Sequence, residues 1–346
     1  MKTPNKLLVF FLLFTIFAFH IAAHDLSNKF ISQKPGIDPF EFLDIELNPD
    51  GSLTRNRNPT VPPNTTSSLA FSKDVLLNPE KKTWVRIHIP NKPESELQNL
   101  PMILFIHGGG FIMGSAIAPD VDLFLENAVN QLNVLVVSVE YRLAPEHRLP
   151  AAYDDAMEAL LWIKENNDEW VKKYGDVTKC IIMGESAGGN IAYTLGIRAS
   201  YVVDRLEPLV IKGIVLMQPF FGQVSRTETE LYANGGLPLE VTDLMWNFSL
   251  PIGANRNHPY SNPSIDTFSK WDKIKELDWK VAFAACDGDG LFDKEIEVYN
   301  LMKNYGVNVL SSFGKGGYHG IYIQEMDQSR KIFELVESIL SSYMSN

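Results

Sequence analysis

The stretch Cys180-Ile181-Ile182-Met183-Gly184-Glu185-Ser186-Ala187-Gly188-Gly189-Asn190 decides how the rest of the sequence is interpreted. A short apolar run, typical of a buried strand, leads directly into Gly-x-Ser-x-Gly and then into a helical pattern. In this context the pentapeptide predicts a serine on a sharp strand-to-helix turn, with its hydroxyl group at the edge of a sheet. Ser186 is therefore the candidate nucleophile. The alternative is a glycine- and serine-rich turn that has no chemical role.

Apolar runs and helical patterns alternate along most of the chain after residue 101. Runs of about five to seven apolar residues, separated by helical patterns, are typical of buried parallel strands joined by crossover helices. The expected strands are residues 102–106, 134–140, 180–183, 211–217, 281–286 and 307–313. The expected helices include residues 154–166, 187–200, 293–305 and 329–343. The pattern predicts an α/β fold with a mostly parallel central sheet flanked by helices.

The first ninety residues have a different texture, which predicts antiparallel strands. Residues 42–47 alternate in polarity and are followed by the turn Asn48-Pro49-Asp50-Gly51, so we expect a hairpin with residues 52–54. Residues 70–77 and 83–90 alternate as well and are expected to form edge strands. These strands would extend the sheet on one side.

One connection is longer than a crossover requires. Residues 220–279 separate two core strands, and an insertion of this length usually covers a site. We interpret this insertion, together with residues 24–41, as a cap over Ser186. The alternative is a peripheral subdomain with no part in binding.

Length and charge limit the classes of function. The chain has 346 residues, of which 45% are hydrophobic, and this suffices for one large core. Its net charge is -11 and no basic run offsets it, so nucleic acid is not expected as a partner. Small or neutral substrates fit this charge better.

Residues 1–23 have the layout of a secretory signal. Lys2 and Lys6 precede an apolar run over residues 7–19, and Ala22-Ala23 offers a cleavage point. The run is shorter than the roughly 20 residues that span a bilayer. We therefore expect a signal peptide, a mature domain over residues 24–346 without a membrane span, and entry into the secretory pathway. An uncleaved anchor is the alternative, and apoplast, vacuole and endoplasmic reticulum lumen all stay open.

Entry into the secretory pathway would give meaning to two glycosylation sequons. Asn64 begins Asn64-Thr65-Thr66 in a loop rich in proline, asparagine and threonine, and Asn247 begins Asn247-Phe248-Ser249. The first is the better candidate site. Cys180 and Cys286 each lie at one end of an expected strand, so we expect buried free thiols rather than a disulfide.

A serine hydroxyl needs a base to remove its proton and a group to orient that base. His319 lies in a glycine-rich loop directly after the last expected strand, where it can reach across the carboxyl edge of the sheet. The acid should precede the base in the chain. Asp293 is interpreted as a helix N-cap, so Asp287 and Asp289 remain as candidates for the acid.

The attack of a serine on a carbonyl group also needs hydrogen-bond donors for the oxyanion. His107-Gly108-Gly109-Gly110-Phe111 follows the first parallel strand, and its glycines let backbone N–H groups turn toward the site. We assign the oxyanion hole to the amides of Gly109, Gly110 and Ala187, with Gly108 shaping the turn. His107 would anchor the loop. A phosphate cradle is the competing interpretation, but no Gly-Lys-Ser/Thr follows.

Motifs for metal ligation are absent from the sequence. No His-Glu-x-x-His or paired cysteine motif is present, and the aspartates near Asp289 lack the spacing of a calcium loop. We expect neither a metal nor a cofactor.

With these residues placed, the chain resembles plant carboxylesterases of the hormone-sensitive-lipase class, within the α/β-hydrolase superfamily. The resemblance covers about residues 44–340 and rests on five motifs: His107 to Phe111, Tyr141-Arg142-Leu143-Ala144-Pro145-Glu146, Leu149 to Asp155, Gly184 to Gly189, and Gly317 to Gly320. It implies an α/β-hydrolase fold and hydrolysis of small-molecule or specialised-metabolite esters through an acyl-enzyme.

The resemblance also selects the acid. Family members commonly read Gly-Asp-Pro-Leu-Ile-Asp, which matches Gly288-Asp289-Gly290-Leu291-Phe292-Asp293 and makes Asp289 the third member of a triad with Ser186 and His319. The chain departs from the family at Gly290, where proline is usual, and in its signal sequence.

Non-esterase relatives have to be weighed. The gibberellin receptor resembles this scaffold but lacks the triad histidine, and isoflavanone-dehydratase-like members carry threonine at the nucleophile, so His319 and Ser186 argue against both. Other plant relatives use the triad for elimination or rearrangement of acylated metabolites. The sequence leaves that reaction open as an alternative, and it does not specify the oligomeric state.

Overall fold

The structure is a computed structural model. It describes residues 36–56, 59–64, 67–165, 168–233, 235–265 and 268–342. The predicted signal peptide, residues 1–23, and most of the predicted cap segment 24–41 lie outside these residues. The chain divides into residues 1–38 and 39–346, and the description below concerns the second unit.

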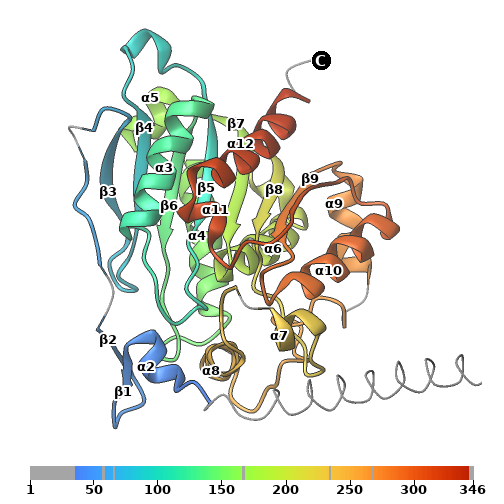
Figure 1. Cartoon of the computed structure of the whole chain (residues 1–346). Coiled ribbons are helices and arrows are strands. Elements are labelled where there is room, and N and C mark those ends of the chain that lie inside the picture. The colour runs from blue at the N-terminus through green and yellow to red at the C-terminus, as the bar shows by residue number, and fades with distance from the viewer. Residues whose placement is uncertain are drawn as a thin grey trace, which may run out of the picture. The chain divides into compact units, whose positions relative to one another are not determined.

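An eight-stranded sheet forms the centre of this unit (Figure 1). Its strand order is β10-β9-β8-β7-β5-β6-β4-β3. The β4 strand pairs antiparallel with β3 and with β6, and all other neighbours are parallel. The predicted mostly parallel sheet with an antiparallel edge is therefore confirmed. The strands are β3 (Ala70–Asn78), β4 (Thr83–Pro90), β5 (Leu100–Ile106), β6 (Leu135–Glu140), β7 (Gly175–Glu185), β8 (Ile211–Met217), β9 (Lys280–Cys286) and β10 (Val309–Gly314).

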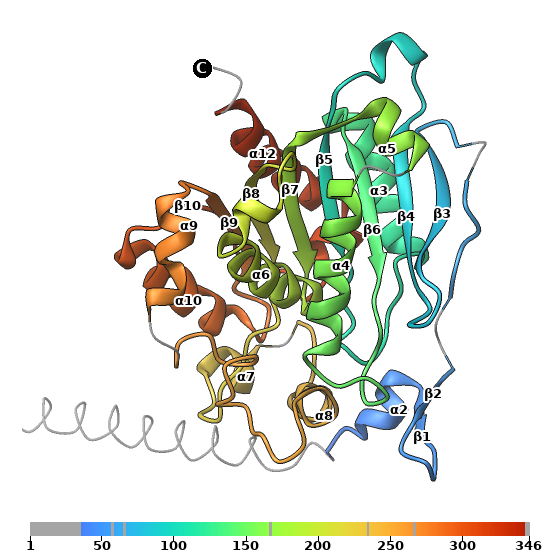
Figure 2. The same cartoon turned by 180° about the vertical axis from the view of Figure 1, so that it is seen from behind.

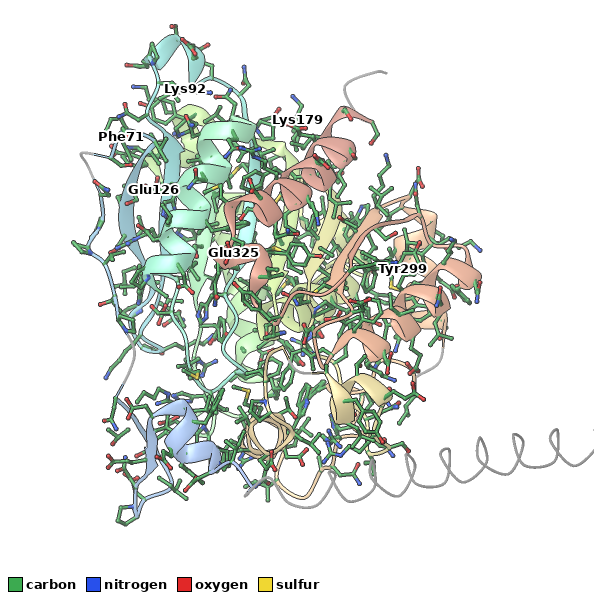
Figure 3. All side chains as sticks on the ribbon, in the orientation of Figure 1. Phe71, Lys92, Glu126, Lys179, Tyr299 and Glu325 are labelled. Atoms are coloured by element: carbon green, nitrogen blue, oxygen red, sulfur yellow. The ribbon has the colours of Figure 1, made fainter. Side chains whose placement is uncertain are left out.

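Helices cover both faces of the sheet. One face carries α3 (Pro119–Leu132), α11 (Ile321–Gln324) and α12 (Met326–Ser341), as Figure 1 shows. The opposite face carries α4 (Ala151–Glu165), α6 (Ala187–Ser200) and α10 (Phe292–Tyr305), which Figure 2 shows from behind. Side chains fill the space between these layers (Figure 3).

The β5 strand shows why the sequence reads as continuous apolar runs. Met102, Leu104 and Ile106 are buried in the core cluster on the α4 and α6 side, whereas Ile103 and Phe105 are buried in the cluster with α3 and α12. Successive side chains of a strand point to opposite faces, so a strand covered on both faces needs apolar residues at every position.

The predicted N-terminal hairpin is present as β1 (Ile45–Leu47) and β2 (Leu53–Arg55). The expectation that the strand begins at residue 42 is wrong, because Pro39–Leu43 forms the short helix α2. A six-residue alternation is too short to separate the two periodicities. Arg55 connects the hairpin to the rest of this unit through an ion pair with Glu146, in which Nη2 and Oε2 lie 2.8 Å apart.

The described part of the insertion between β8 and β9 contains four short helical segments. They are α7 (Glu228–Tyr232), α8 (Leu239–Ser249), η3 (Phe268–Trp271) and α9 (Asp272–Glu276). Trp246 of α8 is buried, and its ring centroid lies 5.5 Å from that of Phe111 in the loop after β5, so the insertion packs on the sheet domain through an apolar contact.

The remaining segments of the described chain are minor. They are α5 (Glu169–Tyr174), η1 (Glu94–Glu96) and η2 (Val203–Arg205). Cys180 and Cys286 are buried and free, as predicted. No helix in the described part of the chain has the length and apolar character that crossing a bilayer requires.

Candidate active site

Ser186 lies on the sharp turn between β7 and α6 that the sequence predicts. Its backbone has φ 54° and ψ -119°, a conformation that non-glycine residues rarely adopt. Two backbone hydrogen bonds of 2.8 Å hold it, one from its N–H to the carbonyl of Met217 and one from the N–H of Phe220 to its own carbonyl. A Cβ atom at Gly188 would lie 2.0 Å from the carbonyl oxygen of Ile106, so only glycine fits beside the turn.

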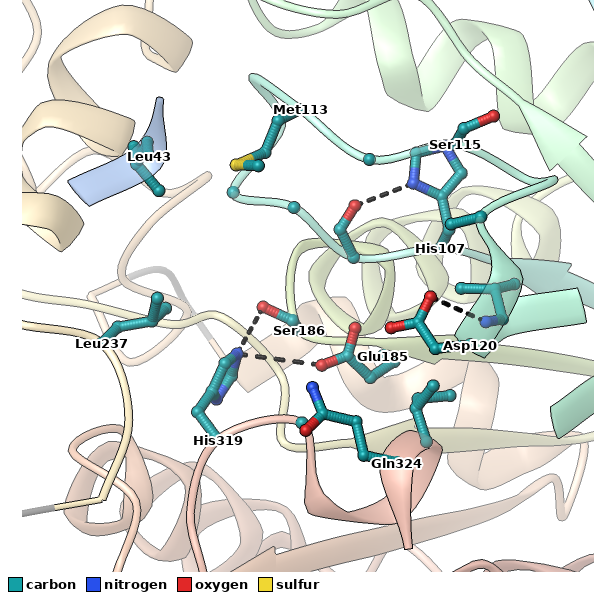
Figure 4. Close-up of a pocket in the computed structure, with 18 of the residues that line it drawn as sticks. Leu43, His107, Met113, Ser115, Asp120, Glu185, Ser186, Leu237, His319 and Gln324 are labelled. Atoms are coloured by element: carbon teal, nitrogen blue, oxygen red, sulfur yellow. Dashed lines mark hydrogen bonds and ion pairs between the residues drawn. The ribbon is translucent and has the colours of Figure 1, made fainter. Parts of the chain in front are cut away.

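The structure brings Ser186, His319 and Asp289 into one hydrogen-bonded chain. Nε2 of His319 lies 2.8 Å from Oγ of Ser186, and Nδ1 lies 2.8 Å from Oδ2 of Asp289. Figure 4 shows the contact between His319 and Ser186. The three residues follow β7, β9 and β10, and the carboxyl ends of these parallel strands meet at one edge of the sheet. This arrangement can move a proton from the serine hydroxyl to an oriented imidazole.

The three candidate carboxylates after β9 have separate environments. Asp289 is 1% exposed, whereas Asp287 is exposed and accepts a hydrogen bond from the N–H of Gly316. Asp293 is not the N-cap that we expected: α10 begins at Phe292, and Oδ2 of Asp293 accepts a hydrogen bond of 2.9 Å from the N–H of Thr229. The helix starts one residue earlier because the Asp289 turn leads directly into it.

The electrostatic environment strengthens His319 as a base. Burial disfavours the imidazolium form, but the charge and hydrogen bond of Asp289, together with the charge of Glu185, outweigh burial and raise the pKa of His319 to about 9. The carboxylate of Glu185 lies 3.8 Å from Nε2 of His319. Burial in turn raises the pKa of Glu185 to about 7, against the opposing charge of His319.

The glycine-rich loop after β5 lies beside the serine. Gly109 has φ +106°, and a Cβ atom there would lie 2.1 Å from the carbonyl oxygen of Met113, so the loop path requires glycine. None of the described residues accepts a hydrogen bond from the N–H of Gly109 or Gly110. As the first residue of α6, Ala187 has no carbonyl group of its own helix to accept its N–H. Gly108 and these three residues therefore lie where an oxyanion hole is expected.

His107 holds the loop and does not reach the serine. Its Nδ1 lies 2.8 Å from the carbonyl oxygen of Gly108, and its ring stacks on Tyr141 with centroids 4.2 Å apart. The hydroxyl of Tyr141 donates to the carbonyl groups of His107 and Gly108. Burial lowers the pKa of His107 to about 4, so this imidazole is neutral at physiological pH.

A cavity of about 420 Å³ opens above the serine. Apolar side chains form much of its lining, and they come from α2, the loop after β5, the start of α3, α11 and the long insertion (Figure 4). These apolar residues are Phe42, Leu43, Met113, Ala118, Val121, Leu237, Met245 and Ile323. Asp120 and Glu185 add two carboxyl groups, and no lysine or arginine is among the described lining residues. Among the described residues, no group of three or more His, Cys, Asp and Glu is arranged to hold a metal ion.

Sequence reasoning missed Gln218, which connects the acid and base loops. Its Nε2 donates to Oδ2 of Asp289 at 2.6 Å and to the carbonyl of Tyr318 at 3.1 Å, and its Oε1 accepts from the N–H of Gly320 at 2.9 Å. The available signal was its position directly after β8, at the same sheet edge as the triad. Glu185 and Asp120 were missed as well.

The two sequons differ in accessibility. Asn247 is exposed on α8, whereas Asn64 is half-buried and its side-chain amide donates to Oε1 of Glu126 at 3.2 Å. Glu126 lies on α3 (Figure 3). The folded structure thus leaves Asn247 the more accessible of the two, although the sequence favoured Asn64.

Comparisons with known sequences give one consistent result. Residues 103–323 match the family described as alpha/beta hydrolase fold. The chain is 41% identical over 322 residues to carboxylesterase 20 of Arabidopsis thaliana, which covers 90% of this chain and 98% of that protein. It is also 41% identical over 298 residues to a 3-O-acetylpapaveroxine carboxylesterase of Papaver somniferum, covering 82% of this chain and 91% of that protein.

Solved structures with the same fold include esterases. A hyperthermophilic esterase from the archaeon Pyrobaculum calidifontis superimposes with a TM-score of 0.66 at 26% identity, covering 79% of this chain and 86% of that chain. A fungal esterase from Rhizomucor miehei has a TM-score of 0.68 at 24% identity and covers 79% of this chain and 85% of that chain. The second likeness concerns the fold alone.

Proposed function

Because this chain belongs to the α/β-hydrolase family and is an enzyme of the carboxylesterase type, we propose that it hydrolyses small-molecule esters through an acyl-enzyme on Ser186. The observation that carries the proposal is the hydrogen-bonded chain from Asp289 through His319 to Ser186, with distances of 2.8 Å at both links. This is the arrangement that serine acylation requires.

The reaction runs in two steps. Oγ of Ser186 attacks the ester carbonyl while Nε2 of His319 takes the hydroxyl proton and then passes it to the leaving alcohol. Asp289 holds the imidazole in the correct tautomer and stabilises the imidazolium. The N–H groups of Gly109, Gly110 and Ala187 stabilise the oxyanion, with Gly108 shaping the loop. Water, deprotonated by His319, then releases the acid.

The cavity supports a proposal for the class of substrate. Its apolar walls and volume of about 420 Å³ suit an ester of small-molecule size rather than a polymer. The relative from Papaver somniferum is named for an acetylated metabolite. Both observations support specialised-metabolite esters as substrates.

Replacing the nucleophile tests the mechanism. The purified protein should hydrolyse a p-nitrophenyl short-chain ester, and Ser186→Ala should lose about 10³-fold or more of kcat. Equal turnover by both proteins would exclude the serine mechanism. Hydrolysis in ¹⁸O-labelled water should place the label in the released acid. With an acylated metabolite, loss of the acyl group without a free alcohol product would indicate elimination or rearrangement instead.

We also propose that the protein enters the secretory pathway and that its destination is the endoplasmic reticulum lumen, the apoplast or the vacuole. The layout of residues 1–23 and the sequons at Asn64 and Asn247 support this location. Sequencing the N-terminus of the protein from its native tissue should show cleavage near Ala23. An intact Met1 would contradict signal cleavage, and treatment with a glycosidase would show whether either asparagine carries a glycan.

A further inference from the structure

Glu185 brings a second carboxyl group to the catalytic imidazole. It directly precedes Ser186, and its side chain is 12% exposed, at the wall of the cavity. Its Oε1 lies 3.8 Å from Nε2 of His319, the nitrogen that takes the serine proton (Figure 4). Asp289 contacts the other ring nitrogen at 2.8 Å. The imidazole therefore lies between two carboxyl groups, one at each nitrogen.

The backbone fixes the position of Glu185. The residue ends β7 and is followed at once by the constrained Ser186 turn. Its Oε2 packs so closely on the oxyanion loop that a Cβ atom at Gly108 would lie 2.0 Å from it. The carboxyl group is thus held between the base and the oxyanion loop, and it does not extend freely into the cavity.

The other titratable groups around this pair come from separate elements. Asp289 after β9 faces His319 directly, and Asp120 on α3 acts electrostatically on Glu185. Glu295 of α10 is completely buried, and burial together with the charges of Asp289 and Glu185 raises its pKa well above the ordinary value. The charges that act on the imidazole are those of Asp289 and Glu185.

We propose that Glu185 is a second electrostatic partner of the catalytic base, which strengthens His319 and stabilises the imidazolium from the side of the reacting nitrogen. This rests on the proposed serine mechanism. A negative charge within about 4–6 Å of an imidazole favours its protonated form. Glu185 ionises above about pH 7, so its charge is present in the alkaline range where His319 loses its proton.

The charge has two opposite kinetic effects. A stronger base takes the serine proton more readily once it is neutral, but it is neutral only at higher pH. Removing the charge should therefore move the acid limb of the pH profile of kcat/KM to lower pH and lower the plateau at high pH. The profiles of the two enzymes would cross. A residue that only supports the fold would lower both parts of the profile together.

The variant Glu185→Gln tests this inference, because glutamine keeps the shape and removes the charge. With a short-chain alkyl ester assayed from about pH 5 to about pH 10, the midpoint of the acid limb should fall by about one pH unit. Glu185→Asp, which keeps the charge, should stay near the wild-type midpoint. Asp287→Asn removes an exposed carboxylate that contacts the N–H of Gly316 and not His319, and it should leave the midpoint unchanged.

An unchanged midpoint in Glu185→Gln would overturn the inference, as would a uniform loss of rate at every pH. Labelling of Ser186 by a fluorophosphonate keeps this outcome separate from the mechanism itself. If wild type is labelled at Ser186 and the midpoint of Glu185→Gln does not move, only the role of Glu185 fails. If Ser186 is not labelled and Ser186→Ala remains active, the serine mechanism fails as well.

Discussion

Through its side chain, Gln218 holds the two loops that carry Asp289 and His319 in position relative to each other. Its amide group contacts Asp289, the carbonyl of Tyr318 and the N–H of Gly320, so it holds the acid and both neighbours of His319 at once. It is completely buried and has φ 42°, a strained value for a residue with a side chain. Such strain persists where surrounding contacts fix the backbone, and here those contacts position the base.

Asp289 and Asp287 form a matched pair for testing the acid. Asp289→Asn should lower kcat by roughly 10³–10⁴-fold, because the amide cannot stabilise the imidazolium or hold the correct tautomer. Asp287→Asn should stay close to wild type, since Asp287 is exposed and contacts a loop N–H instead of His319. Steady-state kinetics of the two variants on one ester give the comparison. A large loss in Asp287→Asn with little in Asp289→Asn would reverse the assignment.

The site residues that could be predicted from the sequence are those whose type is required by the local backbone conformation. Gly-x-Ser-x-Gly and the glycine-rich loop are local patterns, because a Cβ atom at Gly109 or Gly188 would meet backbone within a few residues or on the adjacent strand. Gln218 contacts Asp289 and Gly320, which are 71 and 102 positions away in the chain, and Glu185 contacts His319, which is also remote in sequence. Nothing in their local sequence records these partners, so only the folded chain reveals them.

At the scale of elements, the insertion does more than line the cavity. Thr229 of α7 donates from its hydroxyl to the carbonyl of Gly290 and accepts from the N–H of Asp293, and its own N–H donates to the side chain of Asp293. The insertion thus holds the segment that directly follows Asp289.

Thr229→Val should weaken this support while keeping the side-chain shape. Two hydrogen bonds to the acid loop are lost, which should lower the free energy of unfolding by about 1–2 kcal/mol and reduce kcat more than it changes KM. Denaturant melts and kinetics measure both effects. Thr178→Val, at the opposite end of β7 from Ser186, is the control and should leave kcat unchanged. Unaltered kcat in Thr229→Val would show that α7 does not support the acid loop.

The strands were predictable because a strand that is buried on both faces has apolar residues at nearly every position. The helices α2 and α3 were not predicted. Five residues are too few to show a helical period in α2. In α3 the buried apolar residues Val121, Phe124, Leu125, Ala128 and Val129 do follow a helical period, but the burial of Asp122 against Arg86 and His88 is a contact that periodicity does not reveal.

At the scale of the molecule, the net charge of the chain and the carboxyl groups in the cavity favour the same kind of substrate. The whole chain carries a formal charge of -11, and the cavity contains the carboxyl groups of Asp120 and Glu185. The surface field and the local groups both repel anions. Neutral or positively charged esters are therefore favoured at the stage of encounter as well as in the bound state.

A matched set of esters tests this selectivity. An ester with a carboxylate at the end of its acyl chain should have kcat/KM about 10-fold or more below that of a neutral ester of the same length at low salt. The difference should shrink with added salt, since screening weakens the repulsion. Asp120→Asn should narrow the gap further without altering turnover of the neutral ester. Equal kcat/KM for both esters in wild type would contradict the prediction.

The hydrogen bonds of Thr229 have a consequence for engineering. Cap regions are the natural target when the substrate range of an esterase is redesigned, because they line the binding cavity. In this chain the insertion that supplies Leu237 and Met245 to the cavity also supplies the brace behind Asp289. Exchanging the whole insertion for that of a relative would alter substrate specificity. It would also remove the hydrogen bonds of Thr229 that support the loop of Asp289. A chimaera that retains α7 and replaces only α8 should keep its catalytic power.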